Sequence, residues 1–203
     1  MKNMFKDARI LFAITLIAGL ALGGVYYITK EPIAEANATA EAEAYKEVFG
    51  SASSFEIVSE DVDPTSMAIA SEWIANDFEG ISIDKVLEAK DSSGNRLGYV
   101  ISLTTPEGYG GDISFTMGIT NEGILNGISI LEISETAGLG MRAEDVLVPQ
   151  FEDDDVDSYT VTKTGASSES QIDAISGATI TSKAVTGAVN AGLFYFNNVL
   201  GGE

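Results

Sequence analysis

The longest apolar run of the chain covers residues 10–28, and it contains no charged side chain. An α-helix of this length extends roughly 28 Å, which is about the thickness of the hydrocarbon core of a bilayer. Tyr26 and Tyr27 stand near the end of the run, where an interfacial aromatic belt is expected. The pattern therefore predicts a transmembrane helix over residues 10–29.

The charges on the two sides of this helix differ, and the difference predicts its orientation. Three cations precede the helix, whereas a single lysine, Lys30, follows it beside Glu31. Positively charged flanks are retained on the cytoplasmic side of a membrane. We therefore expect a single-pass protein of the cell membrane, with residues 1–9 in the cytoplasm and the part after the helix on the extracytoplasmic side.

A cleaved secretory signal is the competing interpretation of the same segment. Ala34-Glu35-Ala36 has the form of a signal-peptidase site. However, the apolar run is longer than an ordinary signal core, and these alanines lie in a Glu- and Ala-rich segment that predicts helix over residues 31–49. We favour a retained anchor that continues into a helical stalk over residues 30–54.

Period-two alternation of apolar and polar residues dominates the middle of the chain, after a proline turn and a short helix around Trp73. The predicted strands cover residues 86–89, 96–103, 114–119 and 124–133, with turns at 91–95 and 121–123. Such alternation is typical of antiparallel strands with one buried face. We expect an antiparallel meander whose single apolar face is covered by a helix.

An apolar stripe at helical spacing predicts a helix from about Lys183 to Leu200. The stripe consists of Val185, Ala188, Val189, Gly192, Leu193, Phe196 and Leu200. Ser182 is the expected N-cap, and Gly201 is the expected left-handed residue after the last turn. This helix can cover the meander, so the sequence predicts an α+β fold, with one transmembrane helix followed by a single antiparallel-sheet domain over residues 55–203.

The composition narrows the chemistry that this domain can perform. The chain has no cysteine and no histidine, which excludes iron–sulfur ligation, disulfides, histidine-ligated metals and the common Ser-His-Asp and Cys-His catalytic sets. The net charge of −20 opposes binding to a phosphate backbone, so we expect no nucleic-acid partner. The acidic run at residues 152–155 lacks the spacing of a calcium loop and is read as a solvated loop. We expect no metal site and no catalytic side chain, so any redox chemistry must come from an organic cofactor.

One segment does suggest a ligand, namely residues 173–182 with the sequence Asp-Ala-Ile-Ser-Gly-Ala-Thr-Ile-Thr-Ser. Small and hydroxyl-bearing residues precede the predicted helix, whose free N–H groups and positive dipole end favour a phosphate. The glycine pattern of a nucleotide-binding loop is missing. The residues alone therefore leave open whether this is a phosphate site or an ordinary turn into a helix.

A resemblance changes that balance. Ser176-Gly177-Ala178-Thr179, preceded by Asp173, resembles the flavinylation motif of the FMN-binding domain family. That family includes the G subunit of the Rnf electron-transport complex and the C subunit of the sodium-pumping NADH:quinone reductase. The resemblance implies an FMN joined through its phosphate to the hydroxyl of Thr179, in a bond made by a separate flavin transferase.

Two further segments are similar to parts of the same family. Residues 108–113, which include Tyr109, resemble its Gly-Tyr-x-Gly turn, and residues 135–140 resemble its Glu-Thr-Pro-Gly-Leu-Gly loop, with Ala137 in place of the proline. The resemblance implies that this loop lies against the flavin ring. Polar contacts would come from Glu135 and Thr136 and an apolar face from Leu139. From the residues alone, a glycine-rich turn with Leu139 plugging the core is the alternative.

Two charged residues near the motif can each be interpreted in two ways. Asp173 would act either in the attachment of the flavin or in shaping the turn. Lys183, four residues after Thr179, would either neutralise phosphate charge or lie solvated on the helix.

The resemblance implies an electron-carrying subunit of a membrane-bound ion-translocating ferredoxin:NAD oxidoreductase (Rnf) complex. Its partners would be the membrane and redox subunits of that complex, together with the flavin transferase during maturation. Two alternatives remain open. One is a flavoprotein similar to the C subunit of a sodium-translocating NADH:quinone reductase, and the other is a membrane-anchored acidic scaffolding domain without cofactor.

Overall fold

The computed structural model describes residues 2–152 and 155–201 of the chain. By its internal contacts the chain divides into two units, residues 1–42 and 43–203. The elements are α1 Lys2–Val48, β1 Ser54–Val62, η1 Pro64–Ser66, α2 Ala70–Ala75, β2 Ser82–Lys90, β3 Arg96–Thr105, β4 Ile113–Thr120, β5 Leu125–Ile133, η2 Gly140–Arg142, α3 Ala143–Val146, η3 Val148–Gln150, β6 Thr160–Thr162, β7 Gln171–Asp173, α4 Thr179–Tyr195 and η4 Phe196–Leu200.

The first unit is helical throughout its described length. Helix α1 contains, within Phe5–Val48, a stretch that is long and apolar enough to cross a membrane. Side chains such as Leu20 and Leu22 are exposed along it. A continuous apolar surface of this kind is suited to lipid rather than to water. The predicted helical character of residues 31–49 is confirmed as far as Val48, where α1 ends.

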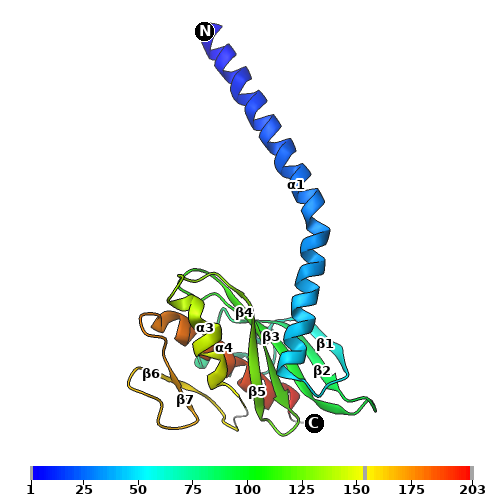
Figure 1. The fold of residues 1–203 in the computed structure, drawn as a ribbon, viewed down its shortest axis with the longest axis vertical. Helices are drawn as coiled ribbons and strands as arrows, with labels where there is room; N and C mark the ends of the chain where they lie inside the picture. The colour runs from blue at the N-terminus through cyan, green and yellow to red at the C-terminus, as the bar shows by residue number, and fades with distance from the viewer. Residues whose placement is uncertain (1, 153–154, 202–203) are drawn as a thin grey trace. The chain divides into compact units, whose positions relative to one another are not determined.

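The second unit is built on a five-stranded antiparallel sheet in the order β1-β2-β3-β4-β5, so every strand pairs with its neighbour in sequence (Figure 1). Tyr99, Ile101 and Leu103 on β3 lie opposite Ile119, Met117 and Phe115 on β4. The predicted meander is confirmed for β2 to β5, and the turn at residues 91–95 is also confirmed. Strand β1 was missed because its alternation is interrupted by a bulge between Ile57 and Ser59.

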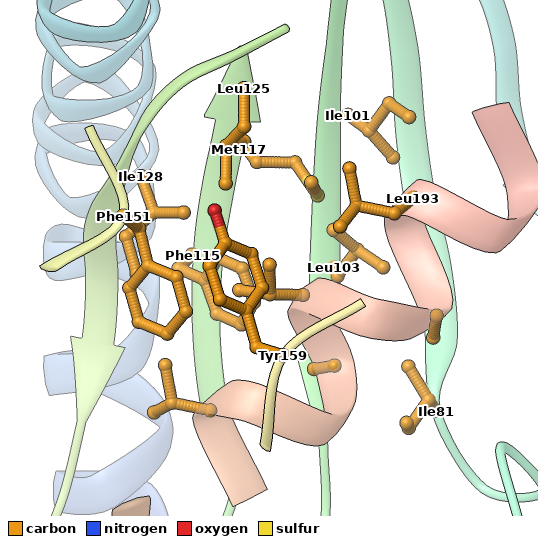
Figure 2. Packing of buried hydrophobic residues seen from close by; sticks show 14 of the residues in the cluster. Ile81, Ile101, Leu103, Phe115, Met117, Leu125, Ile128, Phe151, Tyr159 and Leu193 are labelled. Atoms are coloured by element: carbon orange, nitrogen blue, oxygen red, sulfur yellow. The ribbon is translucent and has the colours of Figure 1, made fainter. Parts of the chain in front are cut away.

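The main core lies between one face of the sheet and α4, as the sequence predicted. Buried side chains of β3 and β4, including Leu103 and Phe115, pack with Leu193 of α4 (Figure 2). Phe151 and Tyr159 close the same core with their rings edge to face, 5.0 Å apart. The predicted α+β architecture is therefore confirmed.

The opposite face of the sheet is also apolar, so the prediction of a single apolar face is wrong. A second buried cluster consists of Tyr45, Val48, Phe49, Leu87, Ala89 and Val100. Side chains from the last turn of α1 and the residue after it cover this face, and the Asn126 side-chain amide donates to the carbonyl of Val48 at 3.1 Å. The alternation in β3 therefore separates two apolar faces, and residues 43–49 belong to the folded domain.

The end of the C-terminal helix also differs from the prediction. Helix α4 passes into the π-helical turn η4, which is closed by a hydrogen bond from Gly201 N–H to the carbonyl of Phe196. Gly201 has φ −82°, so it is not left-handed. This wider π-type hydrogen bond gives the Phe196 carbonyl a donor without a left-handed residue. The predicted left-handed conformation of Gly201 is therefore wrong.

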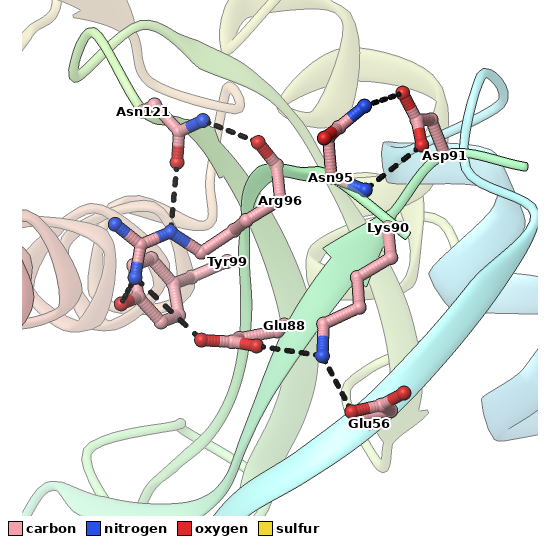
Figure 3. A network of polar contacts seen from close by, with 8 residues as sticks. All are labelled: Glu56, Glu88, Lys90, Asp91, Asn95, Arg96, Tyr99 and Asn121. Atoms are coloured by element: carbon pink, nitrogen blue, oxygen red, sulfur yellow. Dashed lines mark hydrogen bonds and ion pairs between the residues drawn. The ribbon is translucent and has the colours of Figure 1, made fainter. Parts of the chain in front are cut away.

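A polar network joins strands β1, β2 and β3 to the turn between β4 and β5 (Figure 3). Lys90 pairs with Glu56 and Glu88, and its hydrogen bond to Glu56 raises the pKa of Lys90. Arg96 lies 4.8 Å from the centre of the Tyr99 ring and donates to the Asn121 side chain at 3.1 Å. Lys90 and Arg96 therefore stabilise the sheet by joining neighbouring strands.

Two glycines of α4 provide a matched test of the packing between helix and sheet. A Cβ on Gly192 would lie 2.2 Å from Met117 Sδ, which is fully buried, whereas a Cβ on Gly187 would meet nothing within 4 Å. We expect Gly192→Ala to lower the free energy of unfolding by about 1–3 kcal/mol through overpacking. Gly187→Ala should raise it by about 0.5–1 kcal/mol, since alanine is the better helix former. Urea denaturation measures both, and equal effects would contradict the described contact.

Candidate functional site

A pocket of about 500 Å³ lies where three segments of the second unit meet. Its lining consists of Tyr109, Glu135, Thr136, Leu139, Gly140, Gly177, Ala178, Thr179, Ile180 and Thr181. The first residue comes from the β3–β4 connection, the next four from the segment after β5, and the last five from the turn before α4 and its first turn. The structure thus brings the three motif segments to one place.

The start of α4 differs from the sequence prediction by one helical turn. Helix α4 begins at Thr179, and its N-cap is Ala178, whose side chain makes no capping bond. Ser182 is not the N-cap, since it lies fully buried inside the first turn. Its own N–H already makes a helical bond to the Ala178 carbonyl at 3.0 Å, which is why the helix begins earlier.

This start places Thr179 where an anion is favoured. The N–H groups of Thr179, Ile180 and Thr181 precede the first donor of the helix, so the helix ladder does not use them. They lie at the positive end of the helix dipole. Lys183 is exposed one helical turn further along, on the side of the helix that carries Thr179.

The segment after β5 forms a compact loop that is bound to the Tyr109 turn. The Tyr109 N–H donates to Glu135 Oε1 at 2.7 Å. The carbonyl of Thr136 accepts from Leu139 N–H at 3.1 Å and from Met141 N–H at 3.3 Å. Glu135 therefore fixes the position of the neighbouring turn through one of its carboxylate oxygens.

Leu139 lies at the pocket and not in the core. Its side chain is 39% exposed and is absent from the buried clusters of the described residues. It contacts the turn before α4 closely, because a Cβ on Gly177 would lie 3.0 Å from Leu139 Cδ2. Gly177 has φ 82°, a conformation that glycine adopts most easily. The alternative in which Leu139 plugs the core is wrong.

Gly140 brings the loop against α4. A Cβ at this position would lie 2.7 Å from both Thr181 Oγ1 and the Cβ of Glu135. No other residue type fits there without a shift. Gly140, Ile180 and Thr181 line the pocket although they were not singled out in the sequence. The sequence could have indicated them, because they directly follow Leu139 and Thr179 along the chain.

Asp173 and Ser176 are not among the residues that line the pocket. The backbone of Asp173 is held by Gln150, which accepts from its N–H at 2.7 Å and donates to its carbonyl at 3.2 Å. Ser176 is exposed at the tip of the turn. Asp173 is thus the last residue of β7, and Ser176 lies in the turn that precedes Thr179.

The lining of the pocket combines apolar surface with hydrogen-bonding groups. Exposed apolar side chains, namely those of Tyr109, Leu139 and Ile180, stand beside three threonine hydroxyls and one carboxylate. Within the described residues, no group of three or more acidic side chains could hold a metal ion. Asp153 and Asp154 of the acidic run lie outside the described residues. The pocket combines an apolar wall with a helix start whose first N–H groups are not used by the helix, an arrangement that suits a ligand with a flat ring and a phosphate.

Comparison with known proteins agrees with this geometry. The family model of the FMN-binding domain matches residues 108–193, a range that contains all three segments of the pocket. The model of the RnfG N-terminal region matches residues 1–48, which correspond to α1 and the residue before it.

Relatives match over nearly the whole chain. The G subunit of the Na(+)-translocating ferredoxin:NAD(+) oxidoreductase complex of Acetobacterium woodii is 34% identical, over 98% of this chain and 94% of the relative. The G subunit of the proton-translocating complex of Clostridium ljungdahlii is 31% identical, over 98% of both chains. The crystal structure of Shewanella oneidensis NqrC overlaps 57% of this chain and 58% of its own, with 21% identity and a TM-score of 0.46.

Proposed function

Because the chain belongs to the family of G subunits of ion-translocating ferredoxin:NAD(+) oxidoreductase complexes, we propose that it carries electrons in such a complex through an FMN bonded to Thr179. One observation supports Thr179 as the attachment site. Thr179 is the first residue of α4 and lines the pocket, next to N–H groups that the helix does not use. A hydroxyl at that position can carry a phosphoester whose remaining oxygens accept from those N–H groups.

The pocket offers a complementary surface for the remainder of the cofactor. Tyr109, Leu139 and Ile180 would contact the ring, and Thr136 and Thr181 would supply hydrogen bonds. FMN supplies one- and two-electron transfer, which no side chain of this chain provides. The carboxylate of Glu135 lines the same pocket and disfavours additional negative charge there. Lys183 would offset part of the phosphate charge from the exposed side of α4.

A covalent bond would suit a cofactor that is carried on the extracytoplasmic side of the membrane. A cofactor that dissociates there is diluted and lost, whereas a phosphoester retains it. The turn is open to a separate attaching enzyme, because Ser176 and Gly177 are exposed and Thr179 is partly exposed. We therefore include a flavin transferase among the partners, together with the other subunits of the complex.

The attachment is tested on the full chain purified from its own membrane. We expect a fluorescent flavin band after denaturing electrophoresis, and an intact mass larger than that of the polypeptide by one FMN less one water. Peptide mapping should place this increment on the peptide that contains Thr179. A protein of unmodified mass without fluorescence would contradict covalent attachment.

The orientation is tested with protease added to intact spheroplasts. Because Lys2, Lys6 and Arg9 precede the membrane helix, we expect the domain after the helix to lie outside and to be digested. A cytoplasmic protein serves as the control for leakage. Protection of the domain until the membrane is opened would overturn the extracytoplasmic assignment.

The two alternatives from the sequence have less support. The match to the FMN-binding domain argues against a scaffolding domain without cofactor. Relatives that cover nearly the whole chain are named as G subunits of ferredoxin:NAD(+) oxidoreductase complexes, which argues against the role of the C subunit in the NADH:quinone reductase.

A further inference from the structure

The turn that presents Thr179 is short and is held at each of its ends. It runs from Ile175 to Ala178 and is closed by a hydrogen bond from Ala178 N–H to the Ile175 carbonyl at 2.9 Å. Gly177, its third residue, has φ 82°, the positive value that a type II turn has at this position. The side chains of Ile175 and Ala178 are buried, and the two residues between them are exposed. The turn is thus anchored in the core by its first and last residues.

One buried hydroxyl joins these two residues from inside α4. Ser182 Oγ accepts from Ile175 N–H at 3.0 Å and donates to the Ala178 carbonyl at 3.0 Å. Ser182 is fully buried, so both bonds are shielded from water. The hydroxyl uses its proton for one end of the turn and a lone pair for the other. Thr179 follows Ala178 directly, so the bridge holds the backbone next to the residue that bears the Thr179 hydroxyl.

We propose that Ser182 is a positioning residue for flavin attachment, which holds the turn in the conformation that the attaching enzyme accepts. This inference rests on the proposed attachment at Thr179. Ser182 does not line the pocket and takes no part in the chemistry. It acts through the backbone of residues 175–178.

The attachment step shows why such positioning matters. The Thr179 oxygen attacks the phosphorus of the flavin phosphate and forms a P–O bond. A simple phosphate has no good leaving group, so the donor must be a flavin dinucleotide, whose pyrophosphate P–O bond breaks and releases a nucleoside monophosphate. The hydroxyl proton passes to a base of the transferase, and no oxidant or reductant is consumed. The attacking oxygen must stand in line with the leaving group, and a displacement of about 1 Å can slow such a reaction by about 100-fold.

The test measures the rate of flavin attachment to the full chain in detergent, with purified flavin transferase and a flavin dinucleotide. The variants are Ser182→Ala, which removes the bridge, and Ser182→Thr, which retains the hydroxyl. Thr186→Val is the matched control. Thr186 is equally buried one turn later in α4, and its hydroxyl donates to the Ser182 carbonyl at 2.8 Å, away from the turn.

We expect Ser182→Ala to be modified about tenfold more slowly than the unchanged chain, through a lower kcat/KM for the protein acceptor. Thr186→Val should be modified at the unchanged rate, and Ser182→Thr should recover most of the loss. Hydrogen exchange provides a second readout, because the Ile175 amide should lose protection in Ser182→Ala while amides in the middle of α4 retain theirs. This local pattern separates loss of the bridge from general loss of folding.

The outcomes separate this inference from the proposed function. If Ser182→Ala is modified on Thr179 as fast as the unchanged chain, the positioning role is wrong and the attachment site stands. If Thr186→Val is slowed as much as Ser182→Ala, the effect is one of helix stability and the positioning role is again wrong. If the unchanged chain accepts no flavin at Thr179, the proposed function itself fails.

Discussion

Replacing Thr179 with valine should give a folded, membrane-inserted protein that never acquires covalent flavin. Valine retains the β-branched shape and nearly the same volume, but it has no oxygen with which to form a phosphoester. Thr179 is partly exposed at the start of α4, so the loss in the free energy of unfolding should be about 1 kcal/mol or less. Intact mass and in-gel flavin fluorescence measure the result. We expect complete loss of the flavin and of electron transfer by the assembled complex.

Thr181→Val is the matched control for this variant. Thr181 is a second threonine of the same helical turn, it lines the same pocket, and it is 1% exposed. We expect the Thr181 variant to retain covalent flavin, because its hydroxyl is not the attachment point. Full flavin on Thr179→Val would refute the assigned site. Loss of flavin only in the Thr181 variant would move the attachment point by two residues.

The second large effect is expected from Gly140→Ala. The added Cβ would lie 2.7 Å from Thr181 Oγ1 and 2.7 Å from the Cβ of Glu135, so the loop, or the side chains of Glu135 and Thr181, must shift. We expect the free energy of unfolding to fall by about 1–3 kcal/mol. The covalent flavin should remain, because the turn that carries Thr179 is held by other bonds. Its absorption spectrum and potential should change, because the loop that forms one wall of the pocket is displaced.

Ala137→Ser provides the control, since it adds one heavy atom to an exposed position of the same loop. Its stability and flavin spectrum should match those of the unchanged protein. Thermal denaturation and absorption spectroscopy compare the two variants. If Gly140→Ala behaved like Ala137→Ser, the close approach of the loop to α4 would not matter for the site.

Several features of this protein could be predicted from the sequence because they depend on neighbours along the chain. The apolar run of residues 10–28 predicts a helix that is long and apolar enough to cross a membrane, and the described helix α1 has these properties. The alternation of strands β2 to β5, with short turns between them, predicts an antiparallel meander, because hairpins pair consecutive strands. The Ser-Gly-Ala-Thr motif is also local, so a resemblance was sufficient to propose Thr179.

Other features depend on contacts between distant segments, which no local pattern encodes. Strand β3 has two buried faces only because the last turn of α1 packs on the second one. Strands β6 and β7 are each three residues long and exist only as partners of one another. Short elements of this kind are stabilised by tertiary contacts and not by their own propensity.

The site shows the same division. The sequence determined which segments carry the flavin motifs, because each motif is a run of adjacent residues. That Tyr109, Glu135 and Thr179 border one pocket depends on the folded structure, because a side-chain hydrogen bond and the missing side chain of Gly140 bring their segments together. The role of Ser182 depends on the folded structure as well. A serine before a helix was expected to cap it, but a buried hydroxyl bonds to whichever backbone groups the fold brings within reach, and here those are the two ends of the turn.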